Sequence, residues 1–214
     1  MKPRLLVVGA GGHARVVINI ARRMDCWDLV AILAREVPVE PELIDGVPIV
    51  GTYAEAASFL AEGWKHAVLA IGDNDERATL HSRLGLFGYV FPVLTHPWAL
   101  IEKNAIVGDG TVVCAGAIVG TQVVVGRNSI INTGAIIDHE TITGDHVHVA
   151  PGCRIAGRVR IGEGAMLGIG TCVRDKIRIG ARALIGAGSV VVDDISADVV
   201  AYGSPARVAR RRKL

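Results

Sequence analysis

The run Asp138-His139-Glu140 places a histidine between two carboxylates. A histidine with a carboxylate partner can accept a proton from an incoming nucleophile, because the carboxylate fixes the ring tautomer and stabilises the imidazolium that forms. These residue types predict general-base catalysis by His139, with one of the two flanking carboxylates as its support.

Three other interpretations of this region stay open. His139 could be a surface residue without a role. A metal site could form from His139, His146 and His148, since imidazoles are common zinc ligands. Cys153 could act as a nucleophile near these histidines, although it stands at a small-residue position of a repeat, where packing is the ordinary role.

Two glycine-containing loops suggest a second place where a ligand could bind. Residues 5–8 read as a short buried strand, followed by Gly9-Ala10-Gly11-Gly12 and a helix over 13–23. Strand, glycine loop and helix open a nucleotide-binding α/β unit, in which backbone N–H groups and a helix N-terminus meet phosphate. The loop departs from the full G-x-G-x-x-G fingerprint, so this motif by itself has only moderate specificity.

The second loop is Gly72-Asp73-Asn74, which ends a predicted strand over 67–71. Ligands of parallel sheets collect at the carboxyl ends of strands, whereas an ordinary helix cap is the alternative. A strand over 29–33 and helices over 53–61 and 75–86 complete a small α/β domain with a parallel sheet. This domain is expected to occupy residues 1–97, with 94–97 as the junction to a second domain.

From position 107 to 191, every sixth residue is aliphatic, with Thr143 as the single exception. An α-helix repeats near 3.6 residues and a strand at two, so neither explains this period. A hexapeptide period is typical of a solenoid that coils around a triangular prism, with three hexapeptides per rung. We expect residues 98–214 to form such a parallel β-helix, about 24 Å tall over its five rungs. A short-stranded β-sandwich is the alternative, but it would not hold one phase over this length.

Bulk properties exclude some classes of function. A net charge of +2 does not favour nucleic-acid binding. Apolar runs are too short to span a bilayer, and no signal peptide is recognisable. Four scattered cysteines predict free thiols in the cytoplasm. The basic cluster of Arg207 and residues 210–213 is either a solvated tail or a phosphate contact.

Five motifs, spread over nearly the whole chain, carry a family resemblance. They are residues 8–14, residues 70–74 with Arg77, residues 95–97, residues 131–140 and residues 203–206. In these motifs the chain resembles the hexapeptide-repeat sugar acyltransferases of the sialic acid O-acetyltransferase type. Within that group it is similar to the nucleotide-sugar N-acetyltransferases of bacillosamine and N-acetylperosamine synthesis.

The resemblance implies a role for each motif. His139 would be the catalytic base and Glu140 its orienting carboxylate. The acetyl-CoA side would be formed by His148, by the Gly157 N–H facing the thioester carbonyl, and by the closing tail of Gly203, Ser204, Pro205, Ala206 and Arg207. The sugar-nucleotide side would be formed by Gly9, Gly11, Gly12, His13, Gly72, Asp73 and Asn74. The family's solenoid is left-handed, and its members are homotrimers with active sites between neighbouring prisms.

We therefore expect an acetyl-CoA-dependent N-acetyltransferase that acts directly, without a metal, on the amine of a nucleotide-linked amino sugar in surface-polysaccharide synthesis. O-acetylation of sialic acid or a related sugar is the alternative within the family. Two rivals come from other classes: a carbonic-anhydrase-like zinc enzyme on the same solenoid, and a non-catalytic scaffold. Neither nucleic acid nor a membrane is expected as a partner.

Overall fold

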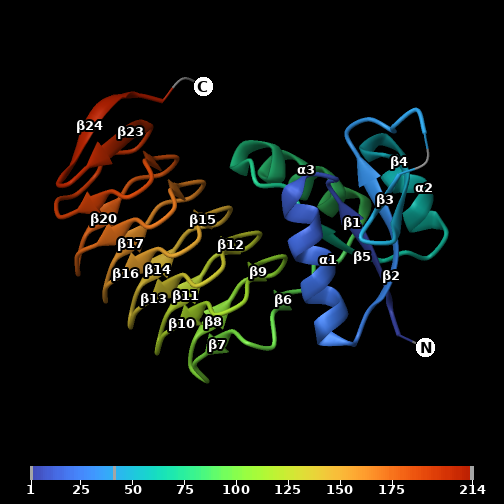
Figure 1. The fold of residues 1–214 in the computed structure, drawn as a ribbon, viewed down its shortest axis with the longest axis horizontal. Helices are drawn as coiled ribbons and strands as arrows, with labels where there is room; N and C mark the ends of the chain where they lie inside the picture. Colours follow the sequence, from blue (N-terminus) through green and yellow to red (C-terminus); the bar gives the residue numbers. More distant parts are fainter. Residues whose placement is uncertain (1, 41, 213–214) are drawn as a thin grey trace. The chain divides into compact units, whose positions relative to one another are not determined.

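The computed structural model describes residues 2–40 and 42–212. The chain divides into two compact units, Met1–Pro97 and Trp98–Leu214 (Figure 1). Lys213, one of the basic residues noted near the C-terminus, lies outside the described residues. None of the helices in the described ranges combines the length and the apolar character needed to cross a membrane.

The first unit is an α/β domain. Its elements are β1 (Arg4–Val8), α1 (Gly12–Met24), β2 (Asp28–Ala34), β3 (Leu43–Ile44), β4 (Val47–Thr52), a 3₁₀ turn (Tyr53–Glu55), α2 (Ala56–Ala61), β5 (His66–Leu69), α3 (Asn74–Phe87) and β6 (Leu94–Thr95). The sheet order is β3-β4-β2-β1-β5, and β1, β2, β4 and β5 pair in parallel. The strand β1, which pairs with β2 on one side and β5 on the other, is fully buried from residue 5 to residue 8, as its continuous apolar run predicts.

The helices α1 and α3 are bounded by local backbone chemistry. Asp25 closes α1 in the left-handed conformation, with φ of 52°. Asp73 caps the start of α3, because its carboxylate accepts a hydrogen bond from the Glu76 N–H at 2.8 Å. The helices α2 and α3 contribute Ala56, Leu80 and Leu84 to a core shared with strands β1, β2 and β5. The cap and this core together fix the turn that joins β5 to α3.

The hairpin β3–β4 was not predicted from the sequence. Pro48 interrupts the apolar run Val47–Thr52, and a proline argues against a central strand. Nevertheless β4 pairs with β2, and β3 turns back on it in antiparallel fashion. The signal was Asp45-Gly46, a dipeptide typical of tight hairpins, whose residues have φ of 48° and 77°.

The second unit is a left-handed parallel β-helix, which confirms the predicted fold class. Its strands are two residues each along most of its length. They are β7 (Leu100–Ile101), β8 (Ile106–Val107), β9 (Val112–Val113), β10 (Ile118–Val119), β11 (Val124–Val125), β12 (Ile130–Ile131), β13 (Ile136–Ile137), β14 (Ile142–Thr143), β15 (His148–Val149), β16 (Arg154–Ile155), β17 (Arg160–Ile161), β18 (Met166–Leu167), β19 (Cys172–Val173), β20 (Arg178–Ile179), β21 (Leu184–Ile185), β22 (Val190–Val191), β23 (Val199–Gly203) and β24 (Ala206–Arg211). Strands three apart in sequence pair in parallel and form three flat walls.

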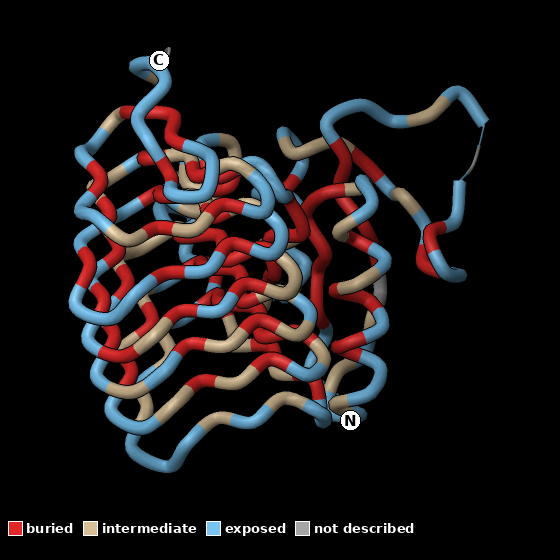
Figure 2. Tube along the Cα trace, turned by 60° about the vertical axis from the view of Figure 1, so that its left-hand side comes forward, coloured by how far each residue is buried: buried red, intermediate tan, exposed pale blue. Residues whose placement is uncertain are grey.

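The second residue of each strand points into the prism. Val119, Ile137 and Ile155 are stacked neighbours on one wall and are at most 2% exposed. Figure 2 shows the buried residues recurring from rung to rung. The one polar member of the period, Thr143, is also buried, and its hydroxyl accepts a hydrogen bond from the Gly126 N–H at 3.2 Å. This bond satisfies the inward hydroxyl, so the polar residue fits the core.

A fragment of residues 98–214 should stay folded and oligomeric when produced alone. Its core runs continuously from position 113 to position 206 and uses no residue of the first unit. Circular dichroism and size-exclusion chromatography check this expectation. From the family resemblance, the fragment should still bind CoA and lose its affinity for nucleotide sugars. An unfolded fragment, or one with full acceptor affinity, would contradict this division of the chain.

Candidate active site

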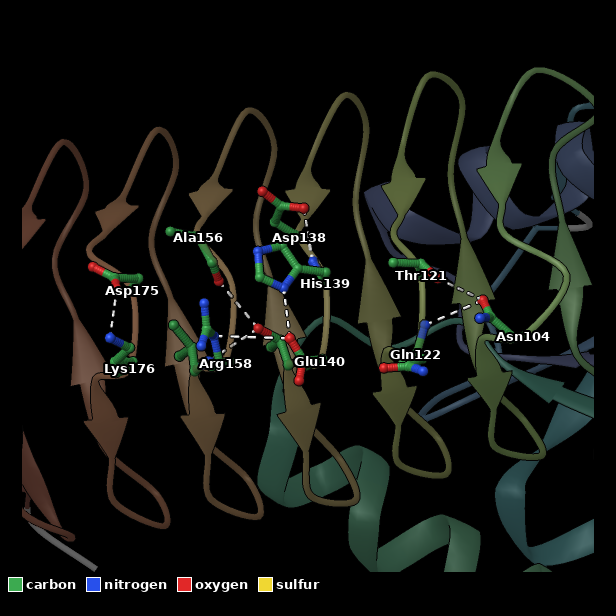
Figure 3. Close-up of polar contacts among 12 residues, drawn as sticks. Asn104, Thr121, Gln122, Asp138, His139, Glu140, Ala156, Arg158, Asp175 and Lys176 are labelled. Carbon is green, nitrogen blue, oxygen red and sulfur yellow. Dashed lines mark hydrogen bonds and ion pairs between the residues drawn. The ribbon is translucent and has the colours of Figure 1, made fainter.

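His139 lies at a corner of the β-helix, between strands β13 and β14 (Figure 3). The His139 N–H donates to Asp138 Oδ1 at 2.7 Å, which fixes the start of the turn. Glu140 follows with φ of 58°, a left-handed conformation that Gln122 and Arg158 share on the adjacent rungs. The repeat therefore dictates the backbone here, and only the side chains distinguish this corner from its neighbours.

The histidine and the glutamate form a pair. His139 Nδ1 lies 2.9 Å from Glu140 Oε2. A neutral ring that donates its Nδ1–H to this carboxylate leaves Nε2 as a hydrogen-bond acceptor, which is the state required of a general base. Arg158 Nε lies 3.8 Å from the same carboxylate oxygen, an exposed contact that contributes little energy. The predicted partnership of His139 and Glu140 thus has the required geometry.

Gly157 lies against the other edge of the imidazole. A Cβ atom built on Gly157 would be 2.4 Å from both Cε1 and Nε2 of His139, far inside van der Waals contact. The two residues stand on successive rungs, as the hydrogen bond from the Arg158 N–H to the His139 carbonyl shows, at 2.8 Å. With the ring in this position, a side chain at residue 157 would clash with it, so glycine lets the imidazole lie against the backbone of the next rung.

The other two histidines of the region are held elsewhere. His148 is on β15, is 8% exposed, and has Nε2 3.2 Å from Asn132 Nδ2. His146 occupies a different corner, where its Nδ1 lies 2.8 Å from Asn128 Nδ2. Across residues 2–40 and 42–212, no three His, Cys, Asp or Glu side chains gather in a way that would hold a metal ion. The contact of His148 with acetyl-CoA stays a prediction.

Cys153 is fully buried, and burial raises the pKa of its thiol. A raised pKa disfavours the thiolate, which is the nucleophilic form. Cys153 also belongs to the buried core of the β-helix. The structure thus favours the packing role over nucleophilic catalysis.

The predicted donor tail forms the hairpin β23–β24. Gly203 has φ of 110°, and the turn residues Ser204 and Pro205 are exposed while Ala206 is buried. Arg207 Nη1 lies 3.0 Å from Asp193 Oδ2 in an exposed ion pair. The guanidinium is accessible to an anionic ligand, and its role toward CoA stays a prediction.

In the first unit, the two predicted loops meet at one pocket of about 570 Å³. Its lining includes six of the predicted acceptor residues: Gly9, Gly11, Gly12, His13, Gly72 and Asp73. Gly9 has φ of 117°, and a Cβ there would lie 2.7 Å from the Ala70 carbonyl, so only glycine lets β1 and the end of β5 approach. At Gly11 a Cβ would meet no atom within 4 Å. This position is open to the pocket.

Asn74, the seventh predicted residue, is not part of the lining. Its side chain is 4% exposed, and its Oδ1 accepts a hydrogen bond from Arg77 Nη2 at 2.8 Å. Its contact with substrate therefore stays a prediction that the pocket does not support directly.

Four polar lining residues were not predicted from the sequence: Arg35, Glu36, Tyr53 and Glu76. Arg35 and Glu36 directly follow β2, whose carboxyl end lies beside that of β1, so the rule applied to Gly72 could have found them. Arg35 Nη2 and Glu76 Oε2 form an ion pair at 2.7 Å. Burial raises the pKa of Tyr53, so its hydroxyl remains a donor at neutral pH.

Residues 4–84 match the PglD N-terminal domain family. A curated relative, UDP-N-acetylbacillosamine N-acetyltransferase of Bacillus subtilis (strain 168), is 36% identical over 112 residues, which are 51% of this chain. The matched region spans 50% of that protein's length.

Two solved structures resemble almost the whole chain. Perosamine N-acetyltransferase from Caulobacter crescentus was solved as a histidine-to-asparagine variant with CoA and GDP-perosamine; it is 34% identical over 95% of both chains, with a TM-score of 0.92. The acetyltransferase domain of PglB from Neisseria gonorrhoeae FA1090, with acetyl coenzyme A, is 33% identical over 97% of this chain and 100% of its own, with a TM-score of 0.90. The chain therefore belongs to the hexapeptide-repeat nucleotide-sugar acetyltransferases, a family of acyltransferase enzymes.

Proposed function

We propose that this protein transfers the acetyl group of acetyl-CoA to the amine of a nucleotide-linked amino sugar. The observation that carries the proposal is the His139–Glu140 pair, at 2.9 Å, set against Gly157, where a Cβ atom would clash with the imidazole. Relatives that cover nearly the whole chain, and whose structures contain CoA with GDP-perosamine or acetyl coenzyme A, support the substrate classes.

The proposed reaction is a direct attack. The acceptor amine adds to the thioester carbonyl while His139 Nε2 takes a proton from the nitrogen, and Glu140 stabilises the imidazolium through Nδ1. The new C–N bond stays, the C–S bond breaks, and the proton held by His139 passes to the departing CoA sulfur. Because the amine attacks the thioester directly, the reaction forms no acyl-enzyme. Cys153 keeps its packing role in the core of the β-helix.

The developing oxyanion needs a hydrogen-bond donor. The Gly157 N–H is well suited, because it lies on the rung after His139 and makes no hydrogen bond within the described part of the chain. A backbone amide fixed by the solenoid requires no reorganisation during the reaction, which favours stabilisation of the transition state over the substrate.

The donor would run from this corner toward the hairpin β23–β24. His148 would contact the donor and the Gly157 N–H would face the thioester carbonyl. Gly203, Ser204, Pro205 and Ala206 would cover the adenine end, and Arg207 would contact CoA phosphates. The exposed guanidinium of Arg207 supports the last of these roles, because charge-assisted bonds to phosphate are strong.

We also propose a homotrimer. The wall that contains β8 and β14 carries large apolar residues at outward-facing positions: Ile106 and Ile142 are 62% and 38% exposed, and Leu100, on another wall, is 52% exposed. Aliphatic side chains repeated along a wall are typical of a surface that a partner covers. The four free cysteines are compatible with the predicted cytoplasmic location.

The acceptor should be acetylated far better when linked to a nucleotide than as a free sugar. A diphosphate can use the glycine loop that opens α1, whereas a free sugar has nothing to place there. Remote contacts of this kind hold the amine near the thioester, so their loss should lower turnover as well as affinity. A panel of UDP-, GDP- and dTDP-linked amino sugars, compared with the free sugars in a thiol-release assay, tests this.

Gly11→Val sharpens the same test, because its side chain would enter open pocket space without straining the backbone. The substitution should weaken the binding of the acceptor more than the binding of acetyl-CoA. Gly85→Ala, in α3 and outside the pocket lining, is the matched control and should change neither. Free sialic acid acting as well as any nucleotide sugar would instead favour O-acetylation.

A further inference from the structure

Arg77 is the largest of the fully buried side chains in the described chain, with 1% of its surface exposed. Its Nη1 donates to the carbonyl oxygen of Ile71 at 3.0 Å, and at longer range to those of Gly72, at 3.4 Å, and Asp73, at 3.5 Å. Its Nη2 donates to Asn74 Oδ1 at 2.8 Å. One guanidinium thus donates hydrogen bonds to oxygens of four successive residues, 71 to 74, where β5 leads into α3.

This arrangement needs a physical reason, because burying a guanidinium is expensive. Burial lowers the pKa of Arg77 to about 10, so the group stays charged at neutral pH. The oxygens of the turn compensate the buried positive charge. The guanidinium satisfies these oxygens as hydrogen-bond acceptors, a role that a neighbouring strand would otherwise fill. The turn and the arginine therefore hold each other in place.

The turn is one wall of the acceptor pocket, since Ile71, Gly72 and Asp73 all belong to the lining. In a planar trans peptide the N–H points opposite to the C=O. Carbonyls drawn toward Arg77 therefore orient the amide of Asp73 away from the guanidinium. Asp73 in turn caps α3 through the Glu76 N–H, so the shape of this wall depends on Arg77.

The charged side chains of the pocket lining also favour a role for Arg77 in ligand binding. Among the described residues of the lining, carboxylates outnumber guanidinium groups: Glu36, Asp73 and Glu76 stand against Arg35. Arg35 is itself paired with Glu76. Among the ionised side chains of the lining, a ligand diphosphate would meet more negative than positive charge, and a fixed positive charge in the low-dielectric interior next to the wall would offset part of that excess.

We propose that Arg77 is a positioning residue of the acceptor pocket, whose buried guanidinium holds the 71–74 turn in the shape and field that bind the acceptor diphosphate. It acts through the turn and does not itself touch the substrate. This inference rests on the proposed function of the pocket.

The test compares Arg77→Lys and Arg77→Met with Arg83→Met, an exposed arginine on the same helix. Calorimetric titration with UDP, GDP and dTDP measures the pocket alone. Arg77→Met should lower the affinity for the nucleotide by roughly tenfold or more. Arg77→Lys should lower it by less, because lysine keeps the charge but lacks the several planar donors of the guanidinium. Arg83→Met should bind like the unmodified protein.

Kinetics separate positioning from general damage. The acceptor KM should rise and kcat should fall as the contacts that hold the diphosphate weaken, while the KM for acetyl-CoA stays near its original value. Circular dichroism reports folding. If Arg77→Met does not fold, Asn74→Ala removes one anchor of the guanidinium, leaves its charge, and should weaken nucleotide binding several-fold.

Each result is decisive. Nucleotide affinity unchanged in the folded variants overturns the role of Arg77 and leaves the proposed function standing. An equal fall in kcat and in affinity for both substrates also overturns it, since that indicates a general structural role. Should the unmodified protein bind none of the three nucleotides and acetylate no nucleotide-linked sugar, the proposed function and this inference both fail.

Discussion

Replacing His139 with alanine is expected to lower turnover by roughly two to four orders of magnitude, the usual effect of losing a positioned base. The fold should survive, because the side chain is 37% exposed and outside the aliphatic core. A thiol-release assay with acetyl-CoA, with circular dichroism on the same sample, measures both effects. Glu140→Ala should cost less, because Glu140 orients the ring at 2.9 Å and does not accept the substrate proton.

The matched control is His146→Ala. His146 lies in the same stretch of sequence but pairs with Asn128 at a different corner, so its loss should leave turnover near the original value. Near-normal turnover in purified His139→Ala would contradict the assignment of the base. An equal loss in both variants would show that the assay reports damage to the β-helix.

Gly157→Ala is expected to reduce turnover by about 100-fold, the scale of misplacing a catalytic group by roughly 1 Å. The added Cβ would lie 2.4 Å from Nε2 of His139, so the ring must rotate away from Glu140 or the turn must shift. The backbone itself accepts a side chain here, since His139 and Asp175 occupy the equivalent position on the two adjacent rungs and Thr121 does so one rung beyond His139. The clash is therefore with the imidazole alone.

A double-mutant cycle checks this explanation. His139→Ala combined with Gly157→Ala should recover the melting temperature lost in Gly157→Ala, because the truncated residue 139 makes room for the methyl group. Activity should stay low in the pair, since the base is gone. Full activity in Gly157→Ala would mean that the ring yields without cost, and would remove the constraint on this position.

The β-helix was predictable because its information is local and periodic. Every sixth residue from 107 to 191 faces the prism, including Thr143, and each turn repeats the one before it. The adjacency of His139 and Glu140 was equally visible. The carboxylate that pairs with the imidazole was named only through the family resemblance, which implied Glu140: in the structure Glu140 bonds to Nδ1, while Asp138 accepts from the His139 N–H.

In the first unit, more of the site was decided by tertiary contacts than by local sequence patterns. Glycine loops after two strands were visible in the sequence, yet the pocket also needs Arg35 and Glu76, which meet only because the segment after β2 and the start of α3 line the same pocket in the folded domain. The hairpin β3–β4 and the burial of Arg77 were likewise decided by the tertiary structure. The physical reason is that a repeat specifies what each residue faces through short-range sterics and burial. Strand order, side-chain pairing and the compensation of a buried charge depend instead on contacts between distant residues, whose energies no local pattern records.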